Sequence, residues 1–330
     1  MLATNHHHNP HTNDQGYTPS SIAAANGTQH PSATTTTSSS TANPDCGANY
    51  EFLSVIGSGS FGRICKVRRL RDNQIMARKE IDYRRMKEKE RRQLVQEVNI
   101  LRELAHPNIV KYYSRYVDRE SCVINILMEY CEAGDLSRVI KDHKQRGRWI
   151  SEEVVWTFAA QLIAALHECH HAYAERKRDE GIASGGNTGA GEGGAVLHRD
   201  IKPDNVFLDA DHNAKLGDFG LSTQCTQHDF ARTFVGTPFY MSPELVREQA
   251  YNAKSDIWSL GCLLYELCAL DPPFRGQTHR QLNDNILNVR YPDLSHTHYS
   301  PQLRGLIARM LQLRPDDRPS ARDLFHDPQI

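Results

Sequence analysis

From Tyr50 onward the chain shows short runs of alternating apolar and polar residues, bounded by turn-forming residues. This period-two pattern is typical of β-strands with one buried face. The segment Arg71-Asp72-Asn73 supplies a turn between two of the runs, which indicates an antiparallel hairpin. The pattern predicts strands over residues 50–57, 64–69, 74–82, 110–117 and 122–129.

Other segments have the spacing of helices. Over 87–105, apolar residues recur at helical intervals, as in Leu94, Val98 and Leu101. Ser151 followed by two glutamates is a favourable helix start. Residues 255–270 are apolar nearly all round, which predicts a helix in the centre of a domain.

These elements predict an α+β chain with two lobes. A small β-rich lobe with one main helix covers about 49–130, and a larger, mostly helical lobe covers about 131–330. A cleft between lobes is the expected ligand site. Residues 1–48 are of low complexity and are expected to be a disordered tail. Residues 173–194, charged and then Gly-rich, are expected to form a flexible insertion.

Composition and charge narrow the function classes. The 330 residues are 39% apolar and 24% charged with a formal net charge of −1, which argues against a nucleic-acid-binding protein. No stretch predicts a membrane span, and Met1 to His11 lack the apolar core of a secretory signal. Eight cysteines without a C-x-x-C pair indicate reduced thiols, as in the cytoplasm or nucleus.

A glycine-rich segment, Gly57-Ser58-Gly59-Ser60-Phe61-Gly62, lies between two predicted strands. Its glycines would let backbone N–H groups approach phosphates closely. Alone the pattern is weak. A dinucleotide-binding loop would open a helix here, and a Walker loop would carry a lysine that is absent. A plain hairpin turn would explain one or two glycines, but not three glycines at this spacing.

One lysine and one glutamate stand out in the small lobe. Lys79 lies in the third strand, and Glu97 lies on the apolar face of the 87–105 helix. A carboxylate on an apolar helix face needs a partner, because burial of an unpaired charge is costly. We expect an ion pair that holds Lys79 against the phosphates of a nucleotide.

The segment His198-Arg199-Asp200-Ile201-Lys202-Pro203-Asp204-Asn205 combines three groups that phosphoryl transfer requires. Asp200 would accept the proton of the acceptor hydroxyl, Lys202 would face the γ-phosphate, and Asn205 would bind Mg²⁺. Asp218, in Asp218-Phe219-Gly220, is a second hard ligand for Mg²⁺. The order and spacing of these motifs, with Ser242-Pro243-Glu244, match the protein kinase signature set.

Over roughly residues 50–330 the chain resembles the eukaryotic protein kinases, and within them the NIMA-related serine/threonine kinases. The segments that carry this resemblance are 94–110, 128–136, 215–221, 233–244 and 254–270. The resemblance implies the bilobal kinase fold with ATP in the cleft and Mg²⁺ bridging the phosphates. Lys202 beside Asp200 is the serine/threonine pattern of the family.

The resemblance also implies individual roles. Met128 would be the gatekeeper, and Glu129-Tyr130-Cys131 the hinge that binds adenine. Thr237 would tie the substrate-binding loop to Asp200 and Lys202, Glu244 would pair with Arg318, and Asp256 would anchor the catalytic loop. The implied ATP-contacting residues are Ile56, Gly57, Ser58, Gly59, Ser60, Phe61, Gly62, Arg63, Ile64, Ala77, Lys79, Glu97, Met128, Glu129 and Cys131.

Thr233 matches the activating phosphorylation site of the family, with Arg199 as a partner for the phosphate. The alternative is a loop threonine that is never modified. The family also implies a role in mitosis and the cell cycle, protein substrates, and a place in the cytoplasm, the nucleus or at the centrosome. Relatives carry a C-terminal coiled coil, so dimerisation would require residues beyond 330.

Three alternatives compete with this interpretation. A pseudokinase would usually lack Lys79, Asp200 or Asp218, and all three are present. A small-molecule kinase would not need the peptide groove that Gly236-Thr237-Pro238 helps to build. Tyrosine specificity is disfavoured by Lys202.

Overall fold

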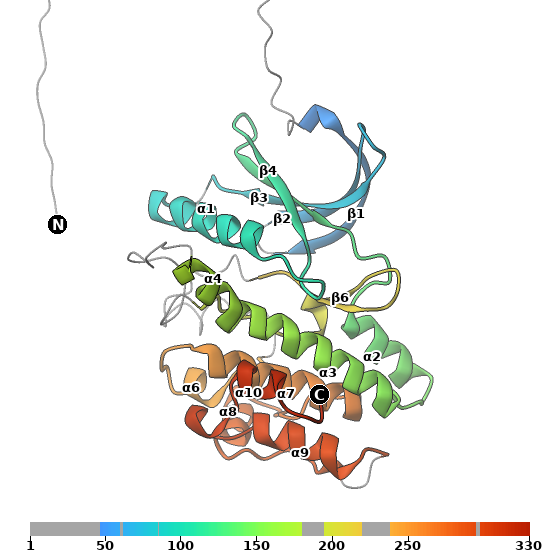
Figure 1. The fold of residues 1–330 in the computed structure, drawn as a ribbon, viewed down its shortest axis with the longest axis vertical. Coiled ribbons are helices and arrows are strands. Elements are labelled where there is room, and N and C mark those ends of the chain that lie inside the picture. Colours follow the sequence, from blue (N-terminus) through green and yellow to red (C-terminus); the bar gives the residue numbers. More distant parts are fainter. Residues whose placement is uncertain (1–46, 60–61, 85, 180–194, 220–237, 295–297) are drawn as a thin grey trace, which may run out of the picture. The chain divides into compact units, whose positions relative to one another are not determined.

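The predicted strands form one five-stranded antiparallel sheet in the order β1-β2-β3-β5-β4 (Figure 1). Its strands are β1 (Tyr50–Gly59), β2 (Gly62–Arg69), β3 (Ile75–Asp82), β4 (Tyr112–Asp118) and β5 (Val123–Glu129). A short 3-10 turn, η1 (Gly47–Asn49), precedes β1. The computed structural model describes residues 47–59, 62–84, 86–179, 195–219, 238–294 and 298–330, all within the unit Asn43–Ile330.

The sheet has two differently packed faces, because successive side chains of a strand point to opposite sides. Ile81, Ile124 and Ile126 pack with Leu94 and Val98 of helix α1 (Glu88–Glu103). The opposite face carries a second apolar cluster, which contains Tyr50, Cys65, Val67, Met76 and Leu127. The helix predicted over 87–105 is therefore present and covers one face.

The rest of the described chain is mostly helical. A two-stranded sheet, β6 (Val206–Leu208) and β7 (Ala214–Leu216), is the exception. The helices are α2 (Leu136–Gln145), α3 (Glu152–His167), α4 (Tyr173–Asp179), α6 (Pro243–Val246), α7 (Ala253–Ala269), α8 (His279–Leu287), α9 (Pro301–Met310) and α10 (Ala321–Phe325). Single turns are the π-helical η2 (Glu168–Ala172) and the 3-10 turns η4 (Pro203–Asn205) and η6 (Pro315–Asp317).

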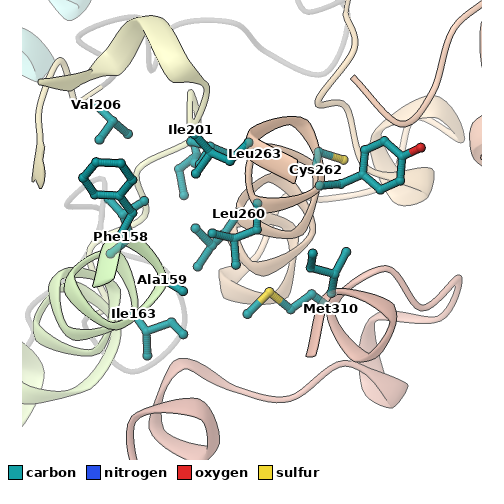
Figure 2. Close-up of a cluster of buried hydrophobic side chains, with 14 of the residues drawn as sticks. Phe158, Ala159, Ile163, Ile201, Val206, Leu260, Cys262, Leu263 and Met310 are labelled. Atoms are coloured by element: carbon teal, nitrogen blue, oxygen red, sulfur yellow. The ribbon is translucent and has the colours of Figure 1, made fainter. Parts of the chain in front are cut away.

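Helix α7 forms the centre of the helical lobe, as its all-round apolar sequence predicts. Leu260, Cys262 and Leu263 of α7 are fully buried. Figure 2 shows them between α3, which contributes Phe158, Ala159 and Ile163, and α9, which contributes Met310. Ile201, within the predicted catalytic motif, and Val206, directly after it, belong to the same cluster. The motif is thus built directly on the core.

Side-chain caps explain where several helices begin. Asp135 accepts a hydrogen bond from the backbone N of Arg138 at the start of α2, and Asn252 forms a capping box with Ser255 at the start of α7. Helix α3 begins after Ser151 as predicted, but the Ser151 side chain makes no capping bond. The favourable acids in its first turn stabilise this end instead.

The first part of the 173–194 segment is helical and is not the flexible insertion that the sequence predicts. Residues 173–179 form helix α4, which continues α3 through η2, so they are not part of a loop insertion. The contacts of this helix include a bond from Arg176 to the carboxylate of the buried Glu168 and one from the Tyr173 hydroxyl to Glu103 at 3.0 Å. Residues 180–194 lie outside the described residues.

None of the helices in the described ranges is both long and apolar enough to cross a membrane.

Candidate active site

The predicted catalytic motif, residues 198–205 before strand β6, brings three predicted residues together. Lys202 Nζ lies 2.7 Å from Asp200 Oδ2, and Asn205 Nδ2 lies 2.8 Å from the same oxygen. Asn205 Nδ2 also donates to the Asp200 carbonyl at 2.7 Å. Oδ1 of Asp200 has no partner among the described residues, so one oxygen of a half-exposed carboxylate is free to accept a proton.

His198 links this segment to strand β7. Its Nε2 lies 3.0 Å from the Gly217 carbonyl, and its Nδ1 lies 3.3 Å from the backbone N of Asp200. These contacts assign the hydrogen to Nε2 and leave Nδ1 as an acceptor. Burial lowers the pKa of His198 despite the nearby carboxylates, which favours this neutral form. The imidazole therefore positions the Asp200 backbone.

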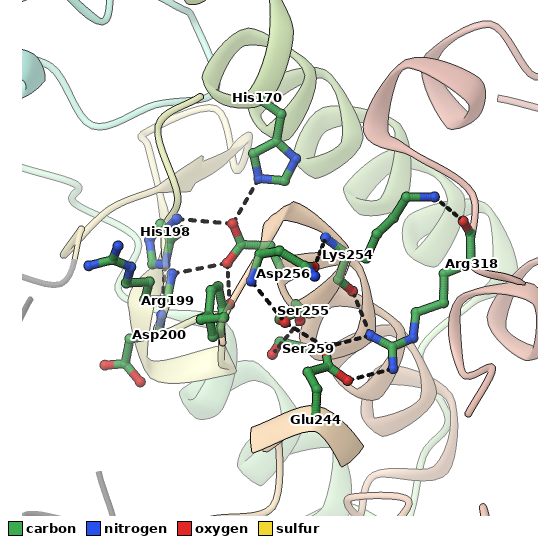
Figure 3. Close-up of polar contacts among 12 residues, drawn as sticks. His170, His198, Arg199, Asp200, Glu244, Lys254, Ser255, Asp256, Ser259 and Arg318 are labelled. Atoms are coloured by element: carbon green, nitrogen blue, oxygen red, sulfur yellow. Dashed lines mark hydrogen bonds and ion pairs between the residues drawn. The ribbon is translucent and has the colours of Figure 1, made fainter. Parts of the chain in front are cut away.

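Asp256 on α7 binds the backbone of the same segment (Figure 3). Its Oδ2 accepts from the backbone N of His198 at 3.0 Å and from His170 Nε2 at 2.7 Å. Its Oδ1 accepts from the backbone N of Arg199 at 2.9 Å and from the Tyr251 hydroxyl. Burial opposes ionisation, but the bonds from His170 and Tyr251 hold the pKa of Asp256 below its ordinary value. The anchoring role expected for Asp256 is confirmed.

Pairing of β6 with β7 brings Asn205 close to Asp218. Val206 lies opposite Leu216, and the backbone N of Gly217 donates to the Asn205 carbonyl at 3.0 Å. Asp218 follows at once, with a left-handed φ of 54°. A Cβ on Gly217 would lie 2.6 Å from Val110 Cγ2, so only glycine fits before this aspartate.

Lys79 reaches this aspartate. Its Nζ donates to Asp218 Oδ1, with the Lys79 side chain 14% exposed. Lys79 on β3 pairs in register with Ile126 on β5, on the face that α1 covers. The expected partner, Glu97, is in α1, but its side chain lies outside the described residues. The Lys79–Glu97 ion pair remains a prediction.

A cavity of about 300 Å³ opens beside these groups. Ile56, Ile64 and Ala77 line it from β1, β2 and β3, and Met128, Glu129 and Cys131 line it at the end of β5. Asp218 lies in its wall. Burial raises the pKa of the Cys131 thiol to about 12, so this cysteine is protonated at neutral pH. The residues predicted around adenine therefore do line one cavity.

The glycine-rich segment connects β1 to β2 as a hairpin. Gly57 lies opposite Ile64, Ser58 opposite Arg63, and Gly59 opposite Gly62. Gly62 has φ 147°, and a Cβ there would lie 1.8 Å from the Glu80 carbonyl. A strand follows this loop and no helix does, which argues against dinucleotide binding. Ser60, Phe61, Thr233 and Thr237 lie outside the described residues.

The pair expected from Ser242-Pro243-Glu244 is present. Arg318 Nη1 and Nη2 each lie 2.8 Å from a Glu244 oxygen, and both side chains are buried (Figure 3). The Arg318 guanidinium also lies 5.0 Å from the centre of the Trp258 ring. Arg318 and Ser255 hold the pKa of Glu244 below its ordinary value against the effect of burial.

Sequence reasoning missed several residues around the site. His170 and Tyr251 were not predicted to bind Asp256, although an acid inside an apolar helix requires several donors. The unpredicted residues that line the cavity are Val110, Glu132, Gly134, Asp135, Arg138 and Phe207. Four of them lie within residues 132–138, whereas Val110 and Phe207 come from distant parts of the chain that only the fold brings to this cavity.

The chain belongs to the protein kinase domain family, whose model, described as "Protein kinase domain", matches residues 50–330. Its sequence is 48% identical to "Serine/threonine-protein kinase Nek2" of Homo sapiens over 289 residues, 87% of this chain and 61% of that protein. It is 45% identical to "G2-specific protein kinase nimA" of Emericella nidulans over 286 residues, 85% of this chain and 41% of that protein. The resemblance to NIMA-related kinases is thereby confirmed.

The match to mouse Nek2 is similar, with 50% identity over 284 residues, 86% of this chain and 60% of that protein. The chain spans about three fifths of the Nek2 proteins and about two fifths of nimA. What these matches share with the chain is the kinase domain itself.

Proposed function

We propose that this chain transfers the γ-phosphoryl group of ATP to serine and threonine hydroxyls of proteins. The observation that carries the proposal is the hydrogen-bonded cluster of Asp200, Lys202 and Asn205, together with Asp218, which lies in the wall of the cavity and is bonded to Lys79. Each group matches one requirement of phosphoryl transfer: a base, cations for phosphate oxygens, and oxygen ligands for a metal.

The cavity suits ATP as the substrate. Ile56, Ile64 and Ala77 offer apolar surface to the adenine ring. The backbone of Cys131 makes no hydrogen bond within the described part of the chain, so its N–H and C=O are available to adenine. Backbone N–H groups of the loop from Gly57 to Gly62, which contains Ser58, Gly59, Ser60 and Phe61, and of the following Arg63 would cover the phosphates.

The donor set fits Mg²⁺. Asn205 uses its Nδ2 for Asp200 and leaves its amide oxygen without a partner among the described residues, and Asp218 supplies carboxylate oxygens. Such oxygens are the ligands that Mg²⁺ prefers. A Mg²⁺ ion held by Asn205 and Asp218 would neutralise phosphate charge on the bound nucleotide.

Side chains of this protein accept the proton and orient the reacting groups. Asp200 accepts the proton of the acceptor hydroxyl as that oxygen bonds to the γ-phosphorus and the bond to the bridging oxygen of ADP breaks. Lys202 donates to Asp200 and stabilises the charge that develops on the transferred group. Lys79 positions the α- and β-phosphates, with Glu97 as its predicted partner.

We also propose that phosphorylation of Thr233 regulates the site. Nε of Arg199, next to Asp200, is buried and has no acceptor in the described ranges, which is the donor a phosphate would need. Thr237 would tie the substrate loop to Asp200 and Lys202, and we retain it as a second regulatory position.

The cellular role follows from the relatives. Because nimA is named a G2-specific kinase and Nek2 a serine/threonine kinase, we propose a cell-cycle role at G2 or mitosis for this chain. We place its action in the cytoplasm or nucleus, with the centrosome as the family's implied site.

The test is transfer of ³²P from ATP to two peptides that differ only in serine or tyrosine as the acceptor. Wild type should label the serine peptide at least 100-fold faster than Asp200→Asn. Asp211→Asn, an exposed turn acid, should match wild type. Equal background rates for wild type and Asp200→Asn would favour a pseudokinase, and labelling of tyrosine alone would overturn the specificity.

A further inference from the structure

A row of polar side chains crosses the face of the five-stranded sheet that α1 does not cover. Arg63 lies opposite Glu80, Glu80 opposite Asn125, and Asn125 opposite Tyr116. Four neighbouring strands thus each place one polar residue in a single row. The adjoining part of this face is the apolar cluster around Met76 and Leu127, so the row is a break in an otherwise apolar surface.

These polar groups are unusually well buried for a sheet surface. The Arg78 and Glu80 side chains are each 13% exposed, and Asn125 is buried. Burial of a charge is costly unless the charge is paired and hydrogen-bonded. None of the three residues faces the kinase cleft, because the cleft side of β3 carries Ala77 and Lys79. The proposed phosphoryl transfer does not explain why they are there.

Two guanidinium groups share one carboxylate in this row. Arg63 Nε donates to Glu80 Oε2, and Arg78 Nη2 lies 2.6 Å from Glu80 Oε1. The Cys65 thiol, 3.7 Å away, is a further donor to Glu80. Burial alone would raise the pKa of Glu80, but the two arginines hold it below its ordinary value, so Glu80 is ionised. The cluster has two cations for one anion.

Donors remain unused on both arginines. Arg78 Nη1 lies 3.3 Å from the Tyr116 hydroxyl, while Arg78 Nε is buried and has no acceptor in the described part of the chain. Arg63 has a side chain 58% exposed and bonds Glu80 through Nε. Asp118, at the rim, uses Oδ1 to accept the backbone N–H groups of Glu120 and Ser121.

A cavity of about 520 Å³ lies over this row. Arg63, Arg78, Glu80 and Asn125 line it from the sheet, and Tyr116, Asp118 and Ser121 line it from β4 and the turn before β5. A hollow of this size with a few convergent polar groups is typical of a small-ligand site.

We propose that this cavity is a second binding site, which takes a phosphate monoester. A phosphate dianion can bind the free guanidinium edge of Arg63 and compete with Glu80 for Arg78. Asn125 adds an uncharged donor. A ligand that carries only a carboxylate has less negative charge than a phosphate dianion. It therefore competes less well with the fixed anions Glu80 and Asp118 for the two arginines and binds more weakly. The phosphate comes either from a small organic phosphate or from a phosphorylated side chain of a peptide.

The test is residue-resolved NMR titration of the ¹⁵N-labelled protein with glycerol 3-phosphate, with a phosphoserine peptide and with its unphosphorylated serine form. Shifts at the Ser121 and Asn125 amides report this cavity and not the kinase cleft. We expect saturable shifts with the phosphorylated probes and none with the serine peptide. The tighter of the two phosphorylated probes identifies the source of the phosphate.

Variants that are expected to change the binding affinity in opposite directions make the test decisive. Arg78→Met should weaken binding at least tenfold, and Arg63→Gln about threefold. Glu80→Gln should tighten it severalfold, because it removes the competing anion. Arg68→Gln, on the opposite face of β2, should have no effect. Weaker binding in Glu80→Gln, or unchanged binding in a folded Arg78→Met, would overturn the proposal. If Arg78→Met does not fold, the binding affinities of Arg63→Gln and Glu80→Gln still test the proposal.

Discussion

Asp256 Oδ1 lies 2.9 Å from the backbone N of Arg199, which joins the largely buried helix α7 to the residue beside Asp200. The same carboxylate also binds the backbone N of His198. An ionised side chain within the core thus fixes the backbone of the catalytic segment. The geometry of Asp200 therefore depends on the helical core as well as on its own motif.

Replacing Asp256 with asparagine tests this dependence. The amide would present N–H donors where a carboxylate now accepts four hydrogen bonds, so at least one backbone N–H loses its acceptor. We expect the free energy of unfolding to fall by about 3 kcal/mol, and kcat to fall more than tenfold. Urea denaturation and peptide kinetics measure the two effects. Asp317→Asn, an exposed acid, is the control, and equal behaviour of the two variants would contradict the anchor.

Glu244 and Arg318 should be coupled energetically. Their side chains are 3% and 0% exposed, so removal of either partner leaves a buried charge. Arg318→Ala should lower the free energy of unfolding by about 4 kcal/mol. In a double-mutant cycle with Glu244→Ala, the double variant should lose less than the sum of the single losses. Additive losses would show that the pair is not coupled.

Gly217→Ala should impair activity more than stability. The added Cβ would lie 2.6 Å from Val110 and 3.0 Å from Phe207, which would displace the backbone before Asp218. We expect kcat/KM to fall at least tenfold while the protein still folds. Gly305→Ala is a matched control, because no atom lies within 4 Å of its added Cβ. In helix α9 that change should stabilise by about 0.5–1 kcal/mol. Wild-type kinetics for Gly217→Ala would refute the steric argument.

Stability should decline as the pH falls below about 6.5, the ordinary histidine pKa. Burial lowers the pKa of His106, His167 and His171 in the folded state. Because the unfolded chain then binds more protons, their contribution is complete above that pH and is lost as the pH falls through the folded values. Urea unfolding at pH 7.5 and 5.5 measures the decline.

His171→Gln should make that decline shallower, because it removes one group whose pKa is lowered. His279→Gln, which replaces an exposed histidine, should leave the decline unchanged. If wild type is equally stable at both pH values, these histidines do not control the acid response.

Local sequence patterns were sufficient to predict the elements and the family. Alternation over 50–57 and helical spacing over 87–105 depend only on which face of a segment is buried, and both elements are present. Asp200, Lys202 and Asn205 are near neighbours in the chain, so their spacing nearly fixes their geometry. The structure of the 173–194 segment was harder to predict from sequence, because helix α4 depends on contacts with Glu103 and Glu168.

The tertiary structure decided which distant groups meet. Lys79 and Asp218 are 139 residues apart in sequence, and His170 lies 86 residues from Asp256. The polar row that includes Glu80 and Asn125 exists because the strand register aligns these two residues across β3 and β5. Sequence specifies a residue's chemistry and the face of its element. Its partners are set by packing and register, since these alone bring side chains from separate segments within hydrogen-bonding distance.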